Sequence, residues 1–236
     1  MKIPDEKSYA CVISRFNDRH EHVAIIHPQS LGPAITISHQ TGSGTHEIAE
    51  RLAQILQKLD DKGARPWAVF DQQLIEQALE ENRWPKELAE KITEDKRLFI
   101  DELMDDLFGL RPPSWVLVPQ VVETMLRLAM AGQAILVGHG ATLVTAKLSN
   151  VFHVRLTGSL PRRIEREQML RKLAPTDAAK FVRKEDRGRE KYVKAHFHAR
   201  LDNELLYDLV INTDRVSIGD AVAVIAEGAQ RFFSVL

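Results

Sequence analysis

The stretch "ITISHQTGSGTHEIAERLAQIL", from Ile35 to Leu56, decides how this chain folds. Its β-branched beginning, with Ala34 before it, is too short for a helix and predicts a buried parallel strand over residues 34–38. Beyond the glycines, apolar residues recur at helical spacing as far as Leu59, with Glu and Arg residues on the opposite face. A strand, a glycine loop and an amphipathic helix in succession are the layout of a phosphate-binding loop.

The loop Gly42-Ser43-Gly44 has the means to bind phosphate through its backbone. Glycines let the chain curl so that successive N–H groups point inward, and a helix starting near Thr45 adds its free N–H groups and the positive end of its dipole. None of these contributions needs a side chain. The residues predicted to bind phosphate are Gly42, Ser43, Gly44, Thr45 and His46.

The loop departs from the full phosphate-binding pattern G-x-x-x-x-G-K-[ST]. When Gly44 is aligned on the second glycine, three of the four fixed positions are missing. They hold His39 for the first glycine, Thr45 for the lysine and His46 for the serine or threonine. Taken alone, the loop is better explained as a strand-to-helix turn with a Ser or Thr cap. Its place after a strand and before an amphipathic helix is what favours phosphate binding.

Further strands alternate with helical segments along the rest of the chain. The strands are expected at residues 67–71, 134–138, 151–156 and 207–214, and helices near residues 88–103, 121–128 and 218–233. This alternation predicts an α/β fold in which helices cover both faces of a parallel sheet. Because ligands bind outside the carboxyl ends of the strands in such sheets, the residues that follow each strand are the candidate site.

The bulk composition limits the functions open to the chain. With 236 residues and 44% hydrophobic content, it can form one large α/β domain. Its net charge of -1 argues against nucleic acid or a membrane surface as a partner, and no apolar run approaches the roughly 20 residues of a membrane span. The single cysteine, Cys11, excludes an internal disulfide framework, and without an apolar signal segment we expect a cytoplasmic protein. The sequence leaves open whether it forms a homo-oligomer.

Six segments then occur in a familiar order: "ITISHQTGSGTHEIAERLAQIL", "VFDQQLIEQ", "AILVGHGATLV", "VFHVRLTGSLPRRIER", "DRGREKYVKAHF" and "LLYDLVINTDRVS". Together they resemble the cytidylate kinase-like family, a branch of the P-loop nucleoside monophosphate kinases, from about Ala34 to the C-terminus. The resemblance implies a three-layer P-loop NTPase-like fold over residues 34–236, with a five-stranded parallel sheet, helices on both faces and a helical lid at about 160–200. Residues 1–33 are expected to be an N-terminal extension, either a short hairpin or a docked arm.

The resemblance also implies an activity. The protein would transfer the γ-phosphoryl group of ATP to a nucleoside monophosphate, for which the family name implies CMP. ATP and Mg²⁺ would be the cofactors, with the metal held through the ATP phosphates and Thr45 as a candidate protein ligand. The family's usual loop is similar to "ISREYGSGG", so the missing lysine is normal for this branch.

The segment "GHG" departs from the family, which usually has "GRG" there. The arginine of that segment matches the position that cytidylate kinases use near the acceptor nucleotide, and His139 stands there in this chain. An imidazole that titrates near about 6.5 is mostly neutral at pH 7 and lacks the fixed fork of a guanidinium. Two alternatives therefore stay open. One is a kinase for another small molecule, in which His139 and Asp71 serve a different acceptor; the other is a non-catalytic nucleotide-binding or scaffold protein with a degenerate loop.

The stretch "AAKFVRKEDRGREKYVKAHF" carries a row of cations on one helix face. They are Lys180, Arg183, Arg187, Lys191 and Lys194. Gly188 is expected to interrupt this helix and to allow a bend. The simpler explanation is a solvated face with neighbouring carboxylates. By resemblance the stripe is a mobile lid whose catalytic residues are Arg183, Arg187, Arg189 and Lys191, with Arg187 and one of the others meeting the transferring phosphoryl group.

Other candidate residues follow the strands. Asp71 ends the second strand, where it would contact the acceptor or cap the next helix. Arg155 ends the fourth strand and faces either the acceptor crevice or a structural carboxylate. Asn212, Thr213 and Asp214 follow the fifth strand, where the family places the donor base, although a strand-end turn explains them equally well.

Overall fold

The fold is built on a five-stranded parallel sheet with the strand order β2-β3-β1-β4-β5. The strands are β1 (Ala34–His39), β2 (Ala68–Asp71), β3 (Ala134–Val137), β4 (Val151–Thr157) and β5 (Leu209–Asn212). This computed structural model describes residues 31–60, 66–71, 117–138 and 140–235. The predicted α/β fold with five parallel strands is confirmed. The hairpin expected within residues 1–33 lies almost wholly outside the described residues, and the helix expected near residues 88–103 lies wholly outside them.

Strand β1 occupies the centre of the sheet because its residues are apolar or β-branched on both faces. Ala34, Ile35 and Ile37 are fully buried. Ile37 pairs in register with Val137 of β3 on one side and with Val154 of β4 on the other. A strand buried on both faces is what a parallel sheet between two helical layers requires.

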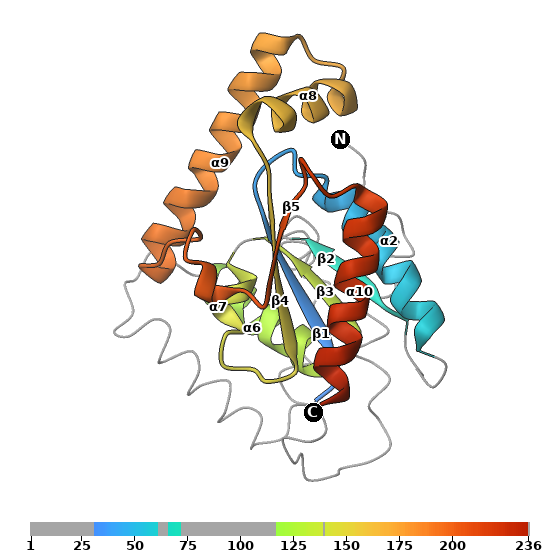
Figure 1. The fold of residues 1–236 in the computed structure, drawn as a ribbon. Helices are drawn as coiled ribbons and strands as arrows, with labels where there is room; N and C mark the ends of the chain where they lie inside the picture. The colour runs from blue at the N-terminus through green and yellow to red at the C-terminus, as the bar shows by residue number, and fades with distance from the viewer. Residues whose placement is uncertain (1–30, 61–65, 72–116, 139, 236) are drawn as a thin grey trace.

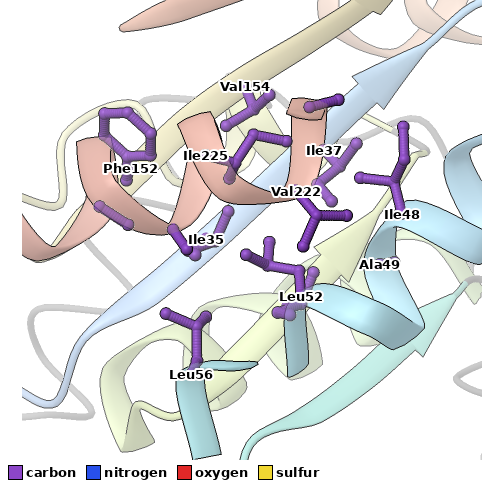
Figure 2. Packing of buried hydrophobic residues seen from close by; sticks show 14 of the residues in the cluster. Ile35, Ile37, Ile48, Ala49, Leu52, Leu56, Phe152, Val154, Val222 and Ile225 are labelled. Carbon is purple, nitrogen blue, oxygen red and sulfur yellow. The ribbon is translucent and has the colours of Figure 1, made fainter. Parts of the chain in front are cut away.

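Helices cover both faces of this sheet (Figure 1). On one face lie α2 (Thr45–Leu59) and α10 (Ile218–Ser234), and on the other α6 (Leu117–Ala131) and α7 (Ala141–Val144). Figure 2 shows the first of these layers, in which Ile35 and Ile37 pack with Leu52 of α2 and Ile225 of α10. The alternation of side chains along β1 thus divides the core into two clusters, one for each face. Within the described ranges, no helix is both long and apolar enough to cross a membrane.

A helical arm, made of α8 (Leu160–Arg171) and α9 (Pro175–Phe197), extends beyond the carboxyl edge of the sheet (Figure 1). Each helix has a proline in its first turn, where the fixed φ of proline suits a helix start. The guanidinium carbon of Arg171 lies 4.2 Å from the centre of the Phe181 ring and joins the two helices. The lid predicted at about 160–200 corresponds to this arm.

Helix α9 continues through Gly188, so the interruption expected there is wrong. A glycine inside a helix costs only about 1 kcal/mol relative to alanine. The buried side chains of Ala178, Val182 and Val193 hold α9 against the rest of the molecule and offset this cost. A Cβ added at Gly188 would meet nothing within 4 Å. Sterics therefore do not require glycine at this position.

We predict that Gly188→Ala raises the free energy of unfolding by about 0.5–1 kcal/mol, because alanine restricts the unfolded chain and meets no neighbour. Gly228 of α10 is the matched control, since it also lies inside a helix but its added Cβ would approach Cζ of Phe152 to 3.2 Å. Gly228→Ala should give a smaller gain or a loss. Urea denaturation measures both variants, and an equal gain at the two positions would contradict the steric explanation.

Candidate active site

The candidate site lies where the strand order reverses, between the carboxyl ends of β1 and β4. From β1 the chain crosses to β2 on one side, and from β4 it passes to β5 on the other. Such a switch point leaves a crevice outside the strand ends. Here the glycine loop (residues 40–44) meets the turn after β4. The Gln40 N–H donates to the carbonyl oxygen of Leu156 at 3.1 Å, and the Gly158 N–H donates to Oε1 of Gln40 at 3.0 Å.

The glycine loop is shaped by Gly42 and Gly44, whose φ angles are 81° and 82°. The Ser43 N–H donates to the carbonyl oxygen of Gln40 at 3.1 Å and closes the turn. A Cβ added at Gly42 would lie 2.4 Å from the carbonyl oxygen of Arg163. Both the backbone angle and this close approach require glycine at position 42. The first turn of α8, which contains Arg163, therefore packs directly on the glycine loop.

Helix α2 begins at the glycine loop with Gly44 as its N-cap and without a side-chain hydrogen bond at that cap. Its first N–H groups and the positive end of its dipole are therefore left for a ligand or solvent. The buried Thr45 hydroxyl lies 3.0 Å from the Ser43 hydroxyl. The exposed His46 ring instead lies 3.1 Å from the Glu50 carboxylate, farther along α2. The side chains of Thr45 and His46 thus take different directions at the start of the helix.

The helical arm binds every polar atom of Thr41, the residue before Gly42. The Thr41 N–H donates to Oδ1 of Asp186 at 2.8 Å, and its carbonyl oxygen accepts from Nη1 of Arg163 at 3.0 Å. Its hydroxyl accepts from Nη1 of Arg189 at 3.2 Å. Arg163 comes from α8, whereas Asp186 and Arg189 come from α9. These four residues, here called the Thr41 clasp, fasten both helices of the arm to the glycine loop.

Asp186 lies between the two arginines of the Thr41 clasp. Its Oδ2 accepts from Nη1 of Arg163 at 2.6 Å, and its Oδ1 lies 3.4 Å from Nη1 of Arg189. Burial favours a higher pKa for the Asp186 carboxyl, but hydrogen bonds from Thr41 and the ion pair with Arg163 together hold that pKa below its usual value. Burial lowers the pKa of Arg189, and Asp186 opposes that effect. The carboxylate therefore stabilises a guanidinium that its surroundings disfavour.

A third buried arginine lies near the Thr41 clasp. Arg155 of β4 is 9% exposed, and its Nη1 donates to the Ser38 hydroxyl at 2.6 Å. Its guanidinium carbon lies 5.7 Å from the centre of the Tyr207 ring, whose hydroxyl also donates to Ser38 at 3.2 Å. In the described part of the chain no carboxylate forms an ion pair with Arg155. The nearby Asp202 carboxylate is paired with Arg200 instead. The hydrogen bond from Arg200 is the largest cause that lowers the pKa of Asp202, and the charge of Arg155 lowers it further.

The arm residues predicted to be catalytic, Arg183, Arg187, Arg189 and Lys191, line one hollow along α9. This hollow has a volume of about 690 Å³, and its described lining holds six lysine and arginine side chains but only one carboxylate, that of Glu185. Arg183, Arg187 and Lys191 are exposed. Arg189 has a side chain that is 14% exposed and reaches Thr41 of the glycine loop. Of the four, Arg189 is thus the one that joins the hollow to the loop.

Arg166 of α8 connects the glycine loop with the turn after β5. Its Nη1 donates to the carbonyl oxygen of Gly42 at 2.5 Å, and its Nη2 lies 3.4 Å from the carbonyl oxygen of Thr213. In that turn Oδ1 of Asn212 accepts from the N–H of Asp214, whose carboxylate accepts from the N-cap N–H of α8, each at 2.9 Å. The Arg166 side chain therefore bridges the glycine loop and the residues predicted to bind the donor base.

The residues predicted to bind the acceptor are placed only in part. Arg155 stands next to β1, paired in register with Ser38. Asp71 ends β2, which β3 separates from β1, so Asp71 lies at the same edge of the sheet but farther from the glycine loop. His139 lies outside the described residues.

Sequence reasoning missed Asp186 and the role of Arg163 in the Thr41 clasp. A signal for Asp186 was available, because the buried Val182 and Val193 mark the inward face of α9. Asp186 and Arg189 follow Val182 by four and seven residues and so lie on that face. The prediction selected the cationic residues of α9, whereas Asp186 beside them forms the hydrogen bond with Thr41 of the glycine loop.

A parallel sheet with a glycine loop at the end of its central strand, a helix opening from that loop and a helical arm fastened over it define a P-loop kinase type of α/β fold. Residues 34–215, well over half of the chain, match the cytidylate kinase-like family. The chain therefore belongs to the cytidylate kinase-like family. No curated protein gave a significant match to it.

Solved structures are similar to this chain at low sequence identity. An uncharacterized protein from Eubacterium ventriosum superimposes with a TM-score of 0.65 at 15% identity, over 84% of this chain and 98% of its own. A shikimate kinase from Bacteroides thetaiotaomicron matches at 14% identity over 83% of this chain and 96% of its own, with a TM-score of 0.44. A gluconokinase from Sinorhizobium meliloti matches at 14% identity over 85% and 93%, with a TM-score of 0.46. At 15% identity the likeness to the Eubacterium ventriosum protein concerns the fold alone.

We predict that Asp186→Asn lowers the free energy of unfolding by about 1–3 kcal/mol at pH 7, because a hydrogen-bonded and paired carboxylate is lost. The pKa of Asp186 is lower in the folded protein, so this stabilisation is present above the unfolded pKa of about 4 and is lost as pH falls through the folded value. The difference between wild type and variant should therefore shrink below about pH 4. Urea denaturation at pH 7, 5 and 3 measures it.

Glu190→Gln is the control, because Glu190 is an exposed carboxylate on the same helix that forms no ion pair within the described residues. We expect it to change the stability by less than about 0.5 kcal/mol at each pH. A deficit of Asp186→Asn that is as large at pH 3 as at pH 7 would show that the charge of the carboxylate is not what stabilises the clasp.

Proposed function

We propose that this protein is a nucleotide kinase-like phosphotransferase. It binds ATP with Mg²⁺ at the glycine loop and transfers the γ-phosphoryl group to a small anionic acceptor, with CMP as the first nucleoside monophosphate to test. The triphosphate would lie at residues 42–46, where the φ angles of Gly42 and Gly44 and the uncapped start of α2 favour an anion. Membership of the cytidylate kinase-like family supports the same assignment.

The observation that carries this proposal is the charge imbalance beside the glycine loop. Arg155, Arg163 and Arg189 are largely buried there, and Asp186 pairs with Arg163 and Arg189 but not with Arg155. Among these described groups, three positive charges against one negative charge leave an excess of two, in a chain whose net charge is -1. Buried charge without a counter-ion is costly. A bound polyphosphate would supply the missing negative charge.

The proposed chemistry needs few protein groups. Phosphoryl transfer depends mainly on positioning and on neutralising charge at the equatorial oxygens, and Arg189 would take that part in place of a loop lysine. The acceptor oxygen of a monophosphate is already ionised at neutral pH, so a general base is not needed. Among the described residues no group of three or more His, Cys, Asp or Glu side chains could hold a metal. Mg²⁺ would be bound by the phosphates and water, with the hydroxyl of Thr45 at the start of α2 as a candidate protein ligand.

The acceptor would lie on the Arg155 side of the crevice. Arg155 has a hydroxyl and an aromatic ring as its described partners, so its charge is available to an acceptor phosphate. Asp71, farther along the same edge, would bind the nucleoside or its ribose. The donor base would lie at Asn212, Thr213 and Asp214.

We predict that ATP with Mg²⁺ raises the melting temperature of the wild-type protein and that ADP is released in the presence of CMP. Arg189→Ala should lower kcat by about 10²–10³-fold, the loss typical of one transition-state donor. Arg155→Ala should mainly raise the KM for the acceptor, by about tenfold or more. The control is Arg231→Ala, an exposed arginine of α10 paired with Glu227, which should leave both constants unchanged.

The acceptor panel decides between the proposal and its alternatives. Release of ADP with another small molecule but with no nucleoside monophosphate would identify a different small-molecule kinase. Stabilisation by ATP without turnover, in the wild type and in His139→Arg, would identify a non-catalytic nucleotide-binding protein. Absence of any stabilisation by ATP, GTP or CTP with Mg²⁺ would contradict the proposal altogether.

A further inference from the structure

We propose that Asp186 is a positioning residue that holds one edge of the Arg189 guanidinium against the glycine loop and thereby aims its other edge at the γ-phosphoryl group. This inference rests on the proposed function, in which Arg189 meets that group. It assigns Asp186 to the same site, although Asp186 carries the charge that repels phosphate. The geometry of the Thr41 clasp is what points to this role.

Within the described part of the chain, one edge of Arg189 is occupied and the other is not. Its Nη1 lies 3.4 Å from Oδ1 of Asp186, 3.2 Å from the Thr41 hydroxyl and 3.3 Å from the carbonyl oxygen of His39. Its Nε and Nη2 donate to none of the described residues. Since a guanidinium has five donors in a fixed plane, holding Nη1 fixes the direction of the rest. The side chain also lines the hollow along α9, so it borders both the loop and open space.

Asp186 is anchored independently of Arg189. The N–H of Thr41 and Nη1 of Arg163 hold its two carboxylate oxygens at 2.8 Å and 2.6 Å. Arg163 has a side chain that is 7% exposed, and it also donates to the carbonyl oxygens of Thr41 and Gly158. The position of the Asp186 carboxylate is therefore set by the glycine loop and by α8. It stays the same whichever rotamer the Arg189 side chain adopts, so it can hold the Arg189 guanidinium in place.

The charges around Arg189 explain why such a support is needed. Asp186 and, less strongly, the exposed Glu185 act on Arg189 as opposite charges, whereas Arg155 and Arg163 act on it as like charges. Without Asp186, the repulsion and the cost of burial would favour an extended side chain directed to solvent. With Asp186, the group formed by Arg163, Asp186 and Arg189 keeps a net charge of one positive unit, so it still attracts a phosphate oxygen.

A purely structural role for Asp186, as a latch that fastens the arm, makes a different prediction. A latch affects stability and every ligand of the site alike, whereas a positioning residue affects the ligand that carries a γ-phosphate. The affinity ratio of ATP over ADP, each with Mg²⁺, separates the two roles, and it is measurable by calorimetry even in a protein without turnover.

We expect Arg189→Ala to lower the ATP-over-ADP affinity ratio by about tenfold or more, the loss of one charge-assisted contact. Asp186→Asn should lower the ratio by a similar factor while changing the affinity for ADP by less than about threefold. The double variant should be no worse than Arg189→Ala alone, because positioning has no effect once the positioned group is absent. Glu190→Gln, which removes an exposed charge from the same helix, should keep the wild-type ratio.

Each departure from this pattern has a distinct meaning. If Arg189→Ala loses the preference for ATP and Asp186→Asn keeps it, or if the two losses multiply in the double variant, the inference is wrong and the proposed function stands. If the wild type binds neither nucleotide, the proposed function fails and the inference falls with it. Should Asp186→Asn not fold, Asp186→Glu takes its place: the longer side chain displaces the carboxylate, and an unchanged ratio there contradicts the inference.

Discussion

The close approach between Gly42 and the carbonyl oxygen of Arg163 governs the architecture of this site. A side chain at position 42 would push the base of α8 away from the glycine loop, since even a Cβ would come within 2.4 Å of that oxygen. The position of α8 in turn sets that of α9, because a short turn joins the two helices. Asp186 and Arg189 reach Thr41 only when α9 lies where it does. One glycine thus allows two helices from late in the chain to meet a loop formed near its beginning.

Carbonyl oxygens, more than carboxylates, accept the hydrogen bonds of the arginines around the glycine loop. Arg163 donates to the carbonyl oxygens of Thr41 and Gly158, and Arg166 donates to that of Gly42. These dipoles replace part of the hydration that the guanidinium groups lose on burial, without cancelling their charge. A field of one sign is therefore confined to the crevice of a nearly neutral protein, which is where a phosphate ligand would need it.

The fold follows from local signals in the sequence, and the site follows only in part. The strands and helices were predictable because residues close together in the sequence determine them. The run of apolar and β-branched residues marks β1 as buried on both faces, and the helical spacing of apolar residues marks the inward face of α2. The glycine loop was predictable for the same reason. The Thr41 clasp was not, because it depends on which way α9 is rotated about its axis, and that rotation is set by packing with segments far away in the chain. The sequence pattern therefore indicated the exposed cations of α9 and not Asp186 as the functional residues. For the same reason Gly188 was expected to break a helix that tertiary packing keeps intact.

A cation that comes from an arm has consequences that a loop lysine does not have. A lysine within the loop moves with the phosphates that the loop binds, so its contribution persists whatever the surrounding helices do. Arg189 stands on α9 and reaches the loop across the Thr41 clasp. If Arg189 neutralises the γ-phosphoryl group, as we propose, the charge available at the reacting centre depends on how firmly α9 is held to Thr41. The hydrogen bonds that fasten the arm would then be part of the chemistry, because a displacement of about 1 Å at a reacting centre is enough to lose much of the benefit of positioning.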